Sequence, residues 1–197
     1  LHLTSTNLLN WKYESTLKLA ADRVIDACVL RLSDGTWRMW YNNERDGKSI
    51  YYADSKDLYT WEDKGKARGT SERGGEGPTV MHWKGRYWMV VDIWAGLRVY
   101  RSDDALTWER QPTDLLSQPG KGEDDGVVGQ HADLVVSGDR AFLFYFTHPG
   151  RRGSNARADG YEQRRSSIQV VELFEKDGWL TCDRDQPTYI RLVPPEP

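Results

Sequence analysis

The chain contains the segment DGTWRMWY at residues 34–41 and a similar segment, KGRYWMVV, at residues 84–91. Each is followed by a second shared segment, SKDLYTW at residues 55–61 and SDDALTW at residues 102–108. A glycine turn between runs of Trp, Tyr, Met and Val is the signal of two strands joined by a hairpin. Because both elements recur in the same order, at spacings of 50 and 47 residues, we expect a fold built from repeats.

The repeat continues in both directions along the chain. An earlier copy of the second element, STNLLNW, occupies residues 5–11, and a third unit runs from QHADLVVS at 130–137 through a Gly-Asp turn to RAFLFYF at 140–146. This unit closes less regularly, through residues 167–173 and 178–179. No segment carries a helical period, so each unit predicts four antiparallel strands.

Four-stranded units at this spacing are typical of β-propeller blades. In the first unit the strands are expected at residues 25–32, 36–42, 49–54 and 61–66. The sequence therefore predicts an all-β propeller of four-stranded antiparallel blades, with residues 1–197 as a single domain. Three full blades fit between about residues 21 and 192, so an incomplete propeller is expected, with residues 1–17 as the outer end of a preceding blade. The alternative is an immunoglobulin-like or jelly-roll sandwich, which rarely repeats a motif at fixed spacing.

Composition limits the possible partners. The net charge is -3, from 27 basic and 30 acidic residues, which gives no reason to expect a nucleic-acid or anionic-membrane partner. Neither a signal peptide nor an apolar run of about 20 residues is visible, so no membrane partner is expected and the compartment stays open. The two cysteines, Cys28 and Cys182, form no CxxC pair, so neither a metal nor another cofactor is expected. Nine tryptophans and ten tyrosines suit strands and also stack on sugars, so a carbohydrate ligand is expected.

A cluster of arginines is the one feature that resembles a nucleic-acid surface. It comprises Arg151, Arg152, Arg157, Arg164 and Arg165. No aromatic residue beyond Tyr161 is interleaved with it, so nucleic-acid binding is not predicted. Metalloprotease, P-loop, nucleophile-elbow and dinucleotide motifs are absent from the sequence, which leaves sugar chemistry or sugar binding.

Antiparallel pairing puts the start of each inner strand and the end of the next strand at one edge of a blade. Asp26 and Glu76 stand nine positions before the turn glycines Gly35 and Gly85, which predicts equivalent positions facing each other across the central funnel. Cleavage of a glycosidic bond needs carboxyl groups on both sides of that bond. We therefore expect Asp26 and Glu76 to be catalytic. The residues expected to bind substrate at the same edge are His131, Trp94, Asp92 and Asn43.

Three motifs carry a family resemblance. The segment VIDA at 24–27 before a hairpin, EGP at 76–78 before a second hairpin, and the Ser-x-Asp turns resemble glycoside hydrolase family 43 and its five-bladed relatives, over about residues 5–150. The resemblance implies three acids: a general base in the family's first blade, an aspartate in its second that tunes and orients, and a general-acid glutamate in its third. Asp26 matches the second acid and Glu76 the third, so the base is expected upstream of this sequence.

The match departs from the family in two places. Ala27 stands where a proline is common, and the segment QHA at 130–132 only loosely resembles the family's histidine motif. We expect Asp26 to raise the pKa of Glu76 by like-charge proximity. The alternatives are a non-catalytic sugar-binding propeller or inactive fragment, and a sialidase, although the turns lack the glycine of its Asp-box. Trp11, Trp61 and Trp108 of the repeated turns are expected to pack in the core, and Trp94 to stack on sugar.

Overall fold

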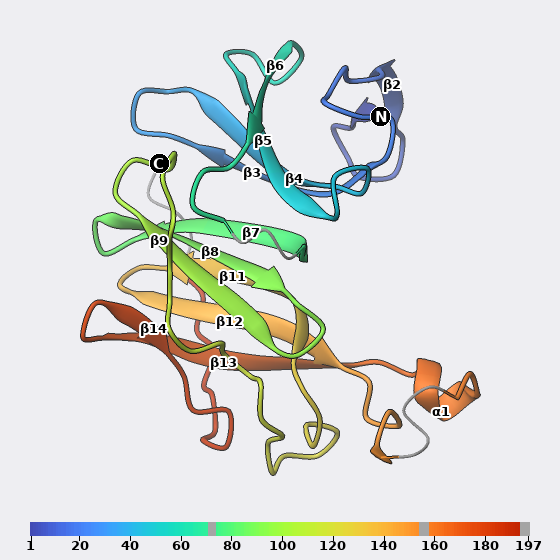
Figure 1. Ribbon diagram of the computed structural model, residues 1–197, viewed down its shortest axis with the longest axis vertical. Coiled ribbons are helices and arrows are strands. Elements are labelled where there is room, and N and C mark those ends of the chain that lie inside the picture. The colour runs from blue at the N-terminus through green and yellow to red at the C-terminus, as the bar shows by residue number, and fades with distance from the viewer. Residues whose placement is uncertain (71–73, 154–157, 194–197) are drawn as a thin grey trace.

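The computed structural model describes residues 1–70, 74–153 and 158–193. It contains three four-stranded antiparallel sheets and one two-stranded sheet (Figure 1). We name each full sheet a blade, after its inner strand. The β3 blade consists of β3 (Val24–Arg31), β4 (Trp37–Asn43), β5 (Ser49–Ser55) and β6 (Trp61–Lys66). The β7 blade consists of β7 (Glu76–Trp83), β8 (Arg86–Asp92), β9 (Leu97–Ser102) and β10 (Glu109–Arg110). The β11 blade consists of β11 (Gln130–Ser137), β12 (Arg140–Thr147), β13 (Ser167–Lys176) and β14 (Trp179–Thr181). The two-stranded sheet consists of β1 (His2–Thr4) and β2 (Lys12–Ser15).

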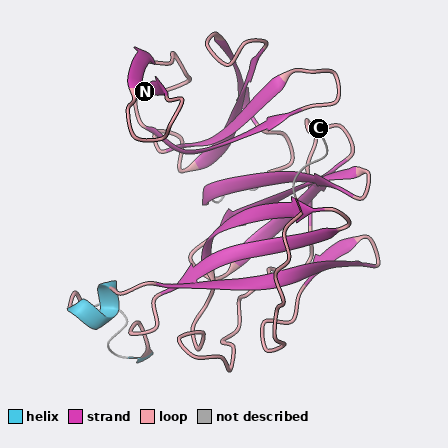
Figure 2. Ribbon diagram, turned by 180° about the vertical axis from the view of Figure 1, so that it is seen from behind, coloured by secondary structure: helices cyan, strands magenta, loops and turns pink. Residues whose placement is uncertain are grey.

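The inner strand β7 lies between β3 and β11 and contacts both of them. The sheets are stacked along the long axis of the molecule, which is vertical in Figure 2. Contacts between neighbouring inner strands involve side chains: the Val80 amide lies 3.3 Å from the Cys28 sulfur, and the Leu134 amide lies 3.3 Å from the Thr79 hydroxyl. This arrangement confirms the expected all-β fold of four-stranded antiparallel blades, consistent with an incomplete propeller.

Apolar side chains fill the spaces between the blades. Trp40 of β4 is fully buried against Trp108, with ring centroids 6.0 Å apart and the rings nearly perpendicular, a geometry that aromatic pairs favour. A larger cluster, which includes Trp88, Leu97 and Leu143, joins the β7 and β11 blades. Burial of both faces of the middle blade explains why β8 reads as a nearly continuous apolar run.

The repeated Ser-x-Asp segments form the same turn wherever they occur. In the β3 blade the Ser55 hydroxyl accepts the Leu58 amide at 2.9 Å, and Asp57 Oδ1 accepts the Thr60 amide at 2.7 Å. In the turns at residues 102–107 and 5–10 the serine hydroxyl again accepts a backbone amide, and the Asp or Asn side-chain oxygen accepts the amide three residues further on. In the β3 and β7 blades this turn leads to the outermost strand, β6 or β10, as the repeat predicts.

The tryptophans that end these turns differ in burial. Trp108 is 3% exposed, and Trp61 packs partly against the cluster formed by Met39 and Tyr41. Trp11 is 54% exposed, so the expectation that it packs in the core is wrong. Trp108 packs against the preceding sheet, whereas among the described residues no sheet packs on the corresponding face of β1 and β2.

A single helical turn, α1 (Tyr161–Arg164), projects at the end of the loop between β12 and β13 (Figure 1). Four of the five clustered arginines there pair with carbonyl or carboxylate oxygens: Arg151, Arg152, Arg164 and Arg165. Arg157 lies outside the described residues. No helix in the described part of the chain is long and apolar enough to cross a membrane.

Candidate functional site

Each inner strand begins with a β-bulge, in which two residues face one position of the neighbouring strand. The pairing register shifts between Ile25 and Cys28, between Glu76 and Thr79, and between Gln130 and Asp133. The first bulged residue has left-handed backbone in all three strands: Asp26 at φ 58°, Gly77 at φ 57° and His131 at φ 41°. Bulges of this kind re-aim side chains at the rims of sheets. Asp26, Gly77 and His131 therefore occupy equivalent positions.

The expected equivalence of Asp26 and Glu76 is wrong by one residue. The hairpin between β3 and β4 has a three-residue loop, 33–35, closed by the Leu32 amide donating to the Thr36 carbonyl. The hairpin between β7 and β8 has a two-residue loop, 84–85. A count back from the turn glycines therefore reaches the residue before the bulge in β7, so Glu76 corresponds to Ile25.

The bulged residues border a depression of about 460 Å³ between the inner strands, lined by residues 26–29, 77–79 and 131–133. Asp26 Oδ2 accepts the Gly77 amide at 3.1 Å, and Asp26 Oδ1 lies 3.9 Å from His131 Nε2. Cys28 also borders the depression, where burial raises the pKa of its thiol, so the thiol stays protonated at neutral pH. Asp26 and His131 are the polar groups that face each other across this space.

Replacing Gly77 by alanine should destabilise the protein more than an ordinary glycine-to-alanine change. A Cβ at Gly77 would lie 2.9 Å from His131 Nε2, and left-handed backbone alone costs an alanine about 1–2 kcal/mol. Gly85 is the matched control, because it is also left-handed, at φ 75°, with nothing within 4 Å of its Cβ position. Urea unfolding should show a larger loss for Gly77→Ala than for Gly85→Ala, and His131→Ala should reduce the difference. Equal losses would mean that the His131 ring does not pack on Gly77.

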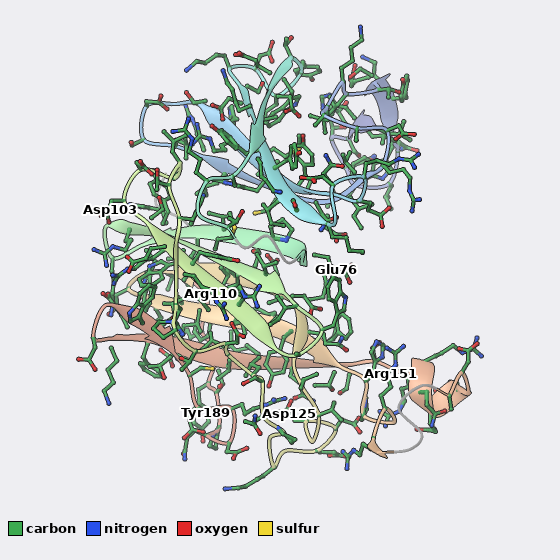
Figure 3. All side chains as sticks on the ribbon, viewed as in Figure 1. Glu76, Asp103, Arg110, Asp125, Arg151 and Tyr189 are labelled. Atoms are coloured by element: carbon green, nitrogen blue, oxygen red, sulfur yellow. The ribbon has the colours of Figure 1, made fainter. Side chains whose placement is uncertain are left out.

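Glu76 begins β7 at the same edge, opposite the edge that carries Asp103 and its Ser-x-Asp turn (Figure 3). Its Oε2 accepts the Lys48 ammonium at 2.6 Å, and its Oε1 accepts the Trp94 indole N–H at 2.9 Å. Burial opposes ionisation of Glu76, but the bonds from Lys48 and Trp94 outweigh it, so the pKa of Glu76 lies below its ordinary value. The expectation that Asp26 raises this pKa is therefore wrong, because the group nearest to Glu76 is a cation.

Asp92 ends β8 directly opposite Glu76. Its side chain is buried and accepts the Trp94 amide at 2.7 Å and the His131 amide at 2.9 Å. Burial raises the pKa of Asp92 in spite of these two bonds, and the nearby Glu76 charge adds to the effect. Asp92 thus fixes the backbone of two other residues at the edge, which suits a supporting role.

Three side chains at this edge have metal-binding atoms close together. Carboxylate oxygens of Glu76 and Asp92 and an imidazole nitrogen of His131 lie within 4.8 Å of one another. Such a set suits a divalent cation. Glu76, however, already binds the Lys48 ammonium, so the protein itself supplies a cation to this carboxylate.

The remaining expected residues lie close by, in different roles. Trp94 is 47% exposed, and Lys48 Nζ lies 5.4 Å from the centroid of its ring. Asn43 is 3% exposed and accepts the Arg45 amide at 3.0 Å, so it shapes the loop after β4. No motif or repeat indicated Lys48, because its contact with Glu76 joins two blades. The repeated bulge could have identified Gly77, since a glycine there aligns with Asp26 once loop lengths are considered.

The fold of this chain is similar to that of several solved structures. A thermostable family-43 glycoside hydrolase matches at 20% identity with a TM-score of 0.60, over 90% of this chain and 63% of that chain. An endo-1,4-beta-xylanase from Bacteroides thetaiotaomicron matches at 17% with a TM-score of 0.65, over 88% and 62%. A third match, at 16% with a TM-score of 0.64 over 94% and 60%, comes from the family 130 of mannoside phosphorylases, which contains glycoside hydrolases that target beta-1,2 mannosidic linkages in Candida mannan.

These neighbours are all of the five-bladed β-propeller type, so the fold expected from the family 43 motifs is confirmed. This chain spans less than two thirds of the length of each of them. No family model and no curated protein matches the sequence.

Proposed function

We propose that this chain supplies the general acid of a glycoside hydrolase that cleaves O-glycosidic bonds of an oligo- or polysaccharide. In this proposal Glu76 is the general acid that protonates the leaving oxygen, and Asp26 holds sugar hydroxyls. Water activation requires a further carboxylate, which we do not assign to a residue of this chain. The observation that carries the proposal is that Asp26 and His131 line a depression between three inner strands, while the Glu76 carboxylate lies beside it, within 4.8 Å of the His131 imidazole.

The two carboxylates have different hydrogen-bond partners, which supports a division of roles. Asp26 accepts the Gly77 amide, and Gly77 directly follows Glu76, so the two carboxylates are fixed relative to each other through the backbone. A sugar in the depression would meet Asp26 and His131 as hydrogen-bonding partners, with Glu76 beside them. Buried Asp92 supports the site by holding the backbone of Trp94 and His131.

Non-catalytic sugar binding is the second candidate function. The observation that favours it is the Lys48–Glu76 ion pair, which stabilises the ionised carboxylate, whereas a general acid must carry a proton. A screen of aryl glycosides with the full-length protein, paired with calorimetric titration of the corresponding oligosaccharides, separates the two. Turnover of at least one glycoside is expected; binding without turnover would favour the second candidate.

Replacing Trp94 by alanine should weaken sugar binding about three- to tenfold, because stacking on an aromatic ring contributes about 0.7–1.4 kcal/mol. Trp94→Phe keeps a ring but removes the indole N–H that binds Glu76. The alanine variant should therefore raise KM, while the phenylalanine variant should act mainly on kcat. Steady-state kinetics on one glycoside would test both, and an unchanged KM in Trp94→Ala would remove this residue from the binding site.

A further inference from the structure

Two hydrogen bonds to its carbonyl hold the backbone of Lys48 in place. It lies in the loop between β4 and β5 with left-handed backbone, φ 59°, a conformation that costs a residue with a side chain about 1–2 kcal/mol. Its carbonyl accepts the Asn42 side-chain amide at 3.2 Å and the Gly75 amide at 3.0 Å. Gly75 directly precedes Glu76, so the β3 blade positions Lys48 against the strand that carries Glu76. Backbone outliers of this kind are frequent at functional sites.

The Lys48 side chain lies between two carboxylates and an aromatic ring. Its ammonium is 2.6 Å from Glu76 Oε2 and 3.7 Å from Glu44 Oε1. All three side chains keep some contact with solvent, at 34% exposure for Lys48, 22% for Glu76 and 21% for Glu44. A small rotation of the lysine would therefore exchange one carboxylate for the other.

Other charged groups face Glu76 from each element around it. They are Lys48 and Glu44 from the β4–β5 loop, Asp92 from β8, His131 from β11, and Asp26 from β3, which reaches the backbone next to Glu76. The nearest cation is Lys48, and the buried Asp92 opposes ionisation of Glu76. Loss of the lysine contact would remove the largest influence that lowers the pKa of Glu76 and leave the Trp94 bond against burial, so the pKa would rise and the protonated acid would be favoured.

We propose that Lys48 is a positioning residue that keeps Glu76 ionised while no sugar is bound and moves onto Glu44 when a sugar lies on Trp94. This inference rests on the proposed function. The ammonium lies 5.4 Å from the centroid of the Trp94 ring, so a sugar stacking on that ring competes with it for the same indole. Displacement of the lysine lets Glu76 take up the proton that it must deliver. Binding of the sugar is thereby linked to uptake of a proton.

The first test measures Glu76 directly. Carboxyl-carbon NMR titration of the full-length protein should place the Glu76 midpoint about one pH unit higher in Lys48→Met, a tenfold gain in proton affinity. Lys64→Met is the matched control, because Lys64 binds Glu62 at 2.7 Å on the outer strand β6. In this variant the titration midpoint of Glu76 should equal that in the wild type. Lys48→Gly suits the left-handed backbone and serves if the methionine variant does not fold. An unchanged midpoint in both Lys48 variants would overturn the proposal.

The second test measures the linkage. Titration calorimetry of an oligosaccharide in buffers of different ionisation enthalpy should show proton uptake in the wild type. Uptake should fall by half or more in Lys48→Met and in Glu44→Gln, which removes the second carboxylate. In kinetics, the alkaline limb of kcat/KM should move upward in Lys48→Met, while that of kcat stays in place, because the two report free and bound protein. Sugar binding without proton uptake would overturn this inference alone, whereas failure to bind or cleave any glycoside would overturn the proposed function.

Discussion

Replacing Glu76 by glutamine in the full-length protein should cut turnover of glycosides with poor leaving groups by about a hundredfold or more, the usual contribution of general acid catalysis. Substrates with good leaving groups, such as dinitrophenyl glycosides, should lose much less, because their leaving oxygen scarcely needs a proton. Glutamine keeps the shape of the side chain and an oxygen that can accept the Trp94 indole N–H. The measurement is kcat on a matched series of aryl glycosides.

Glu62→Gln is the control for this experiment, because Glu62 is an exposed acid on the outer strand β6, and its turnover should match that of the wild type. An equal loss on both leaving-group classes in Glu76→Gln would indicate damaged binding or folding. Unchanged turnover of the poor leaving group would remove Glu76 from the mechanism.

Replacing Arg184 by methionine should lower the free energy of unfolding by about 3–5 kcal/mol, because it leaves an unpaired charge in the interior. The side chains of Arg184 and Asp125 are 8% and 4% exposed and form a two-bonded ion pair, with Nε 2.8 Å from Oδ2. The Tyr145 hydroxyl donates to the same carboxylate at 3.0 Å, and Arg184 also donates to the Gln118 carbonyl. This cluster ties the segment after β14 and the loop before β11 to β12.

Thermal unfolding should show a fall in Tm of roughly 6–20 °C for such a loss in a domain of this size. Arg45→Met is the matched control, since Arg45 and Asp22 form an exposed pair with side chains 56% and 73% accessible, a kind worth about 0–1 kcal/mol. Adding Asp125→Asn to Arg184→Met removes the stranded charge but keeps an acceptor for Tyr145, so more than half of the loss should return. A Tm equal to that of Arg45→Met would show that the pair contributes no net stability.

The strands of the β3 blade were predictable to within one residue at each end. Their expected bounds, 25–32, 36–42, 49–54 and 61–66, compare with observed strands at 24–31, 37–43, 49–55 and 61–66. The reason is that turn residues and apolar runs both depend on local sequence, and both indicated the same boundaries. Burial of Trp11 was not predictable in this way, because it depends on whether another sheet packs on its face.

Relations between blades were harder to predict than the blades themselves. Counting from Gly35 and Gly85 ignored a one-residue difference in loop length, and a shift of one residue in a strand changes the face on which a side chain lies. The prediction that the pKa of Glu76 is raised failed for a related reason. Lys48 reaches Glu76 from another blade, and no repeat or motif in the sequence marks that contact.

Near the start of each of the three inner strands, the bulged residue with left-handed backbone limits which amino acids can occupy that position. Backbone of this kind admits glycine freely and otherwise favours Asn, Asp and His over branched or bulky apolar residues. The three strands carry Asp26, Gly77 and His131 at this position, all members of that small set. Exchanging one of these amino acids for another leaves the backbone unchanged. A single substitution is therefore enough for a blade to gain or lose a titratable group beside the depression. As such proteins diverge in sequence, the chemistry of these three positions should therefore change more readily than their backbone conformation.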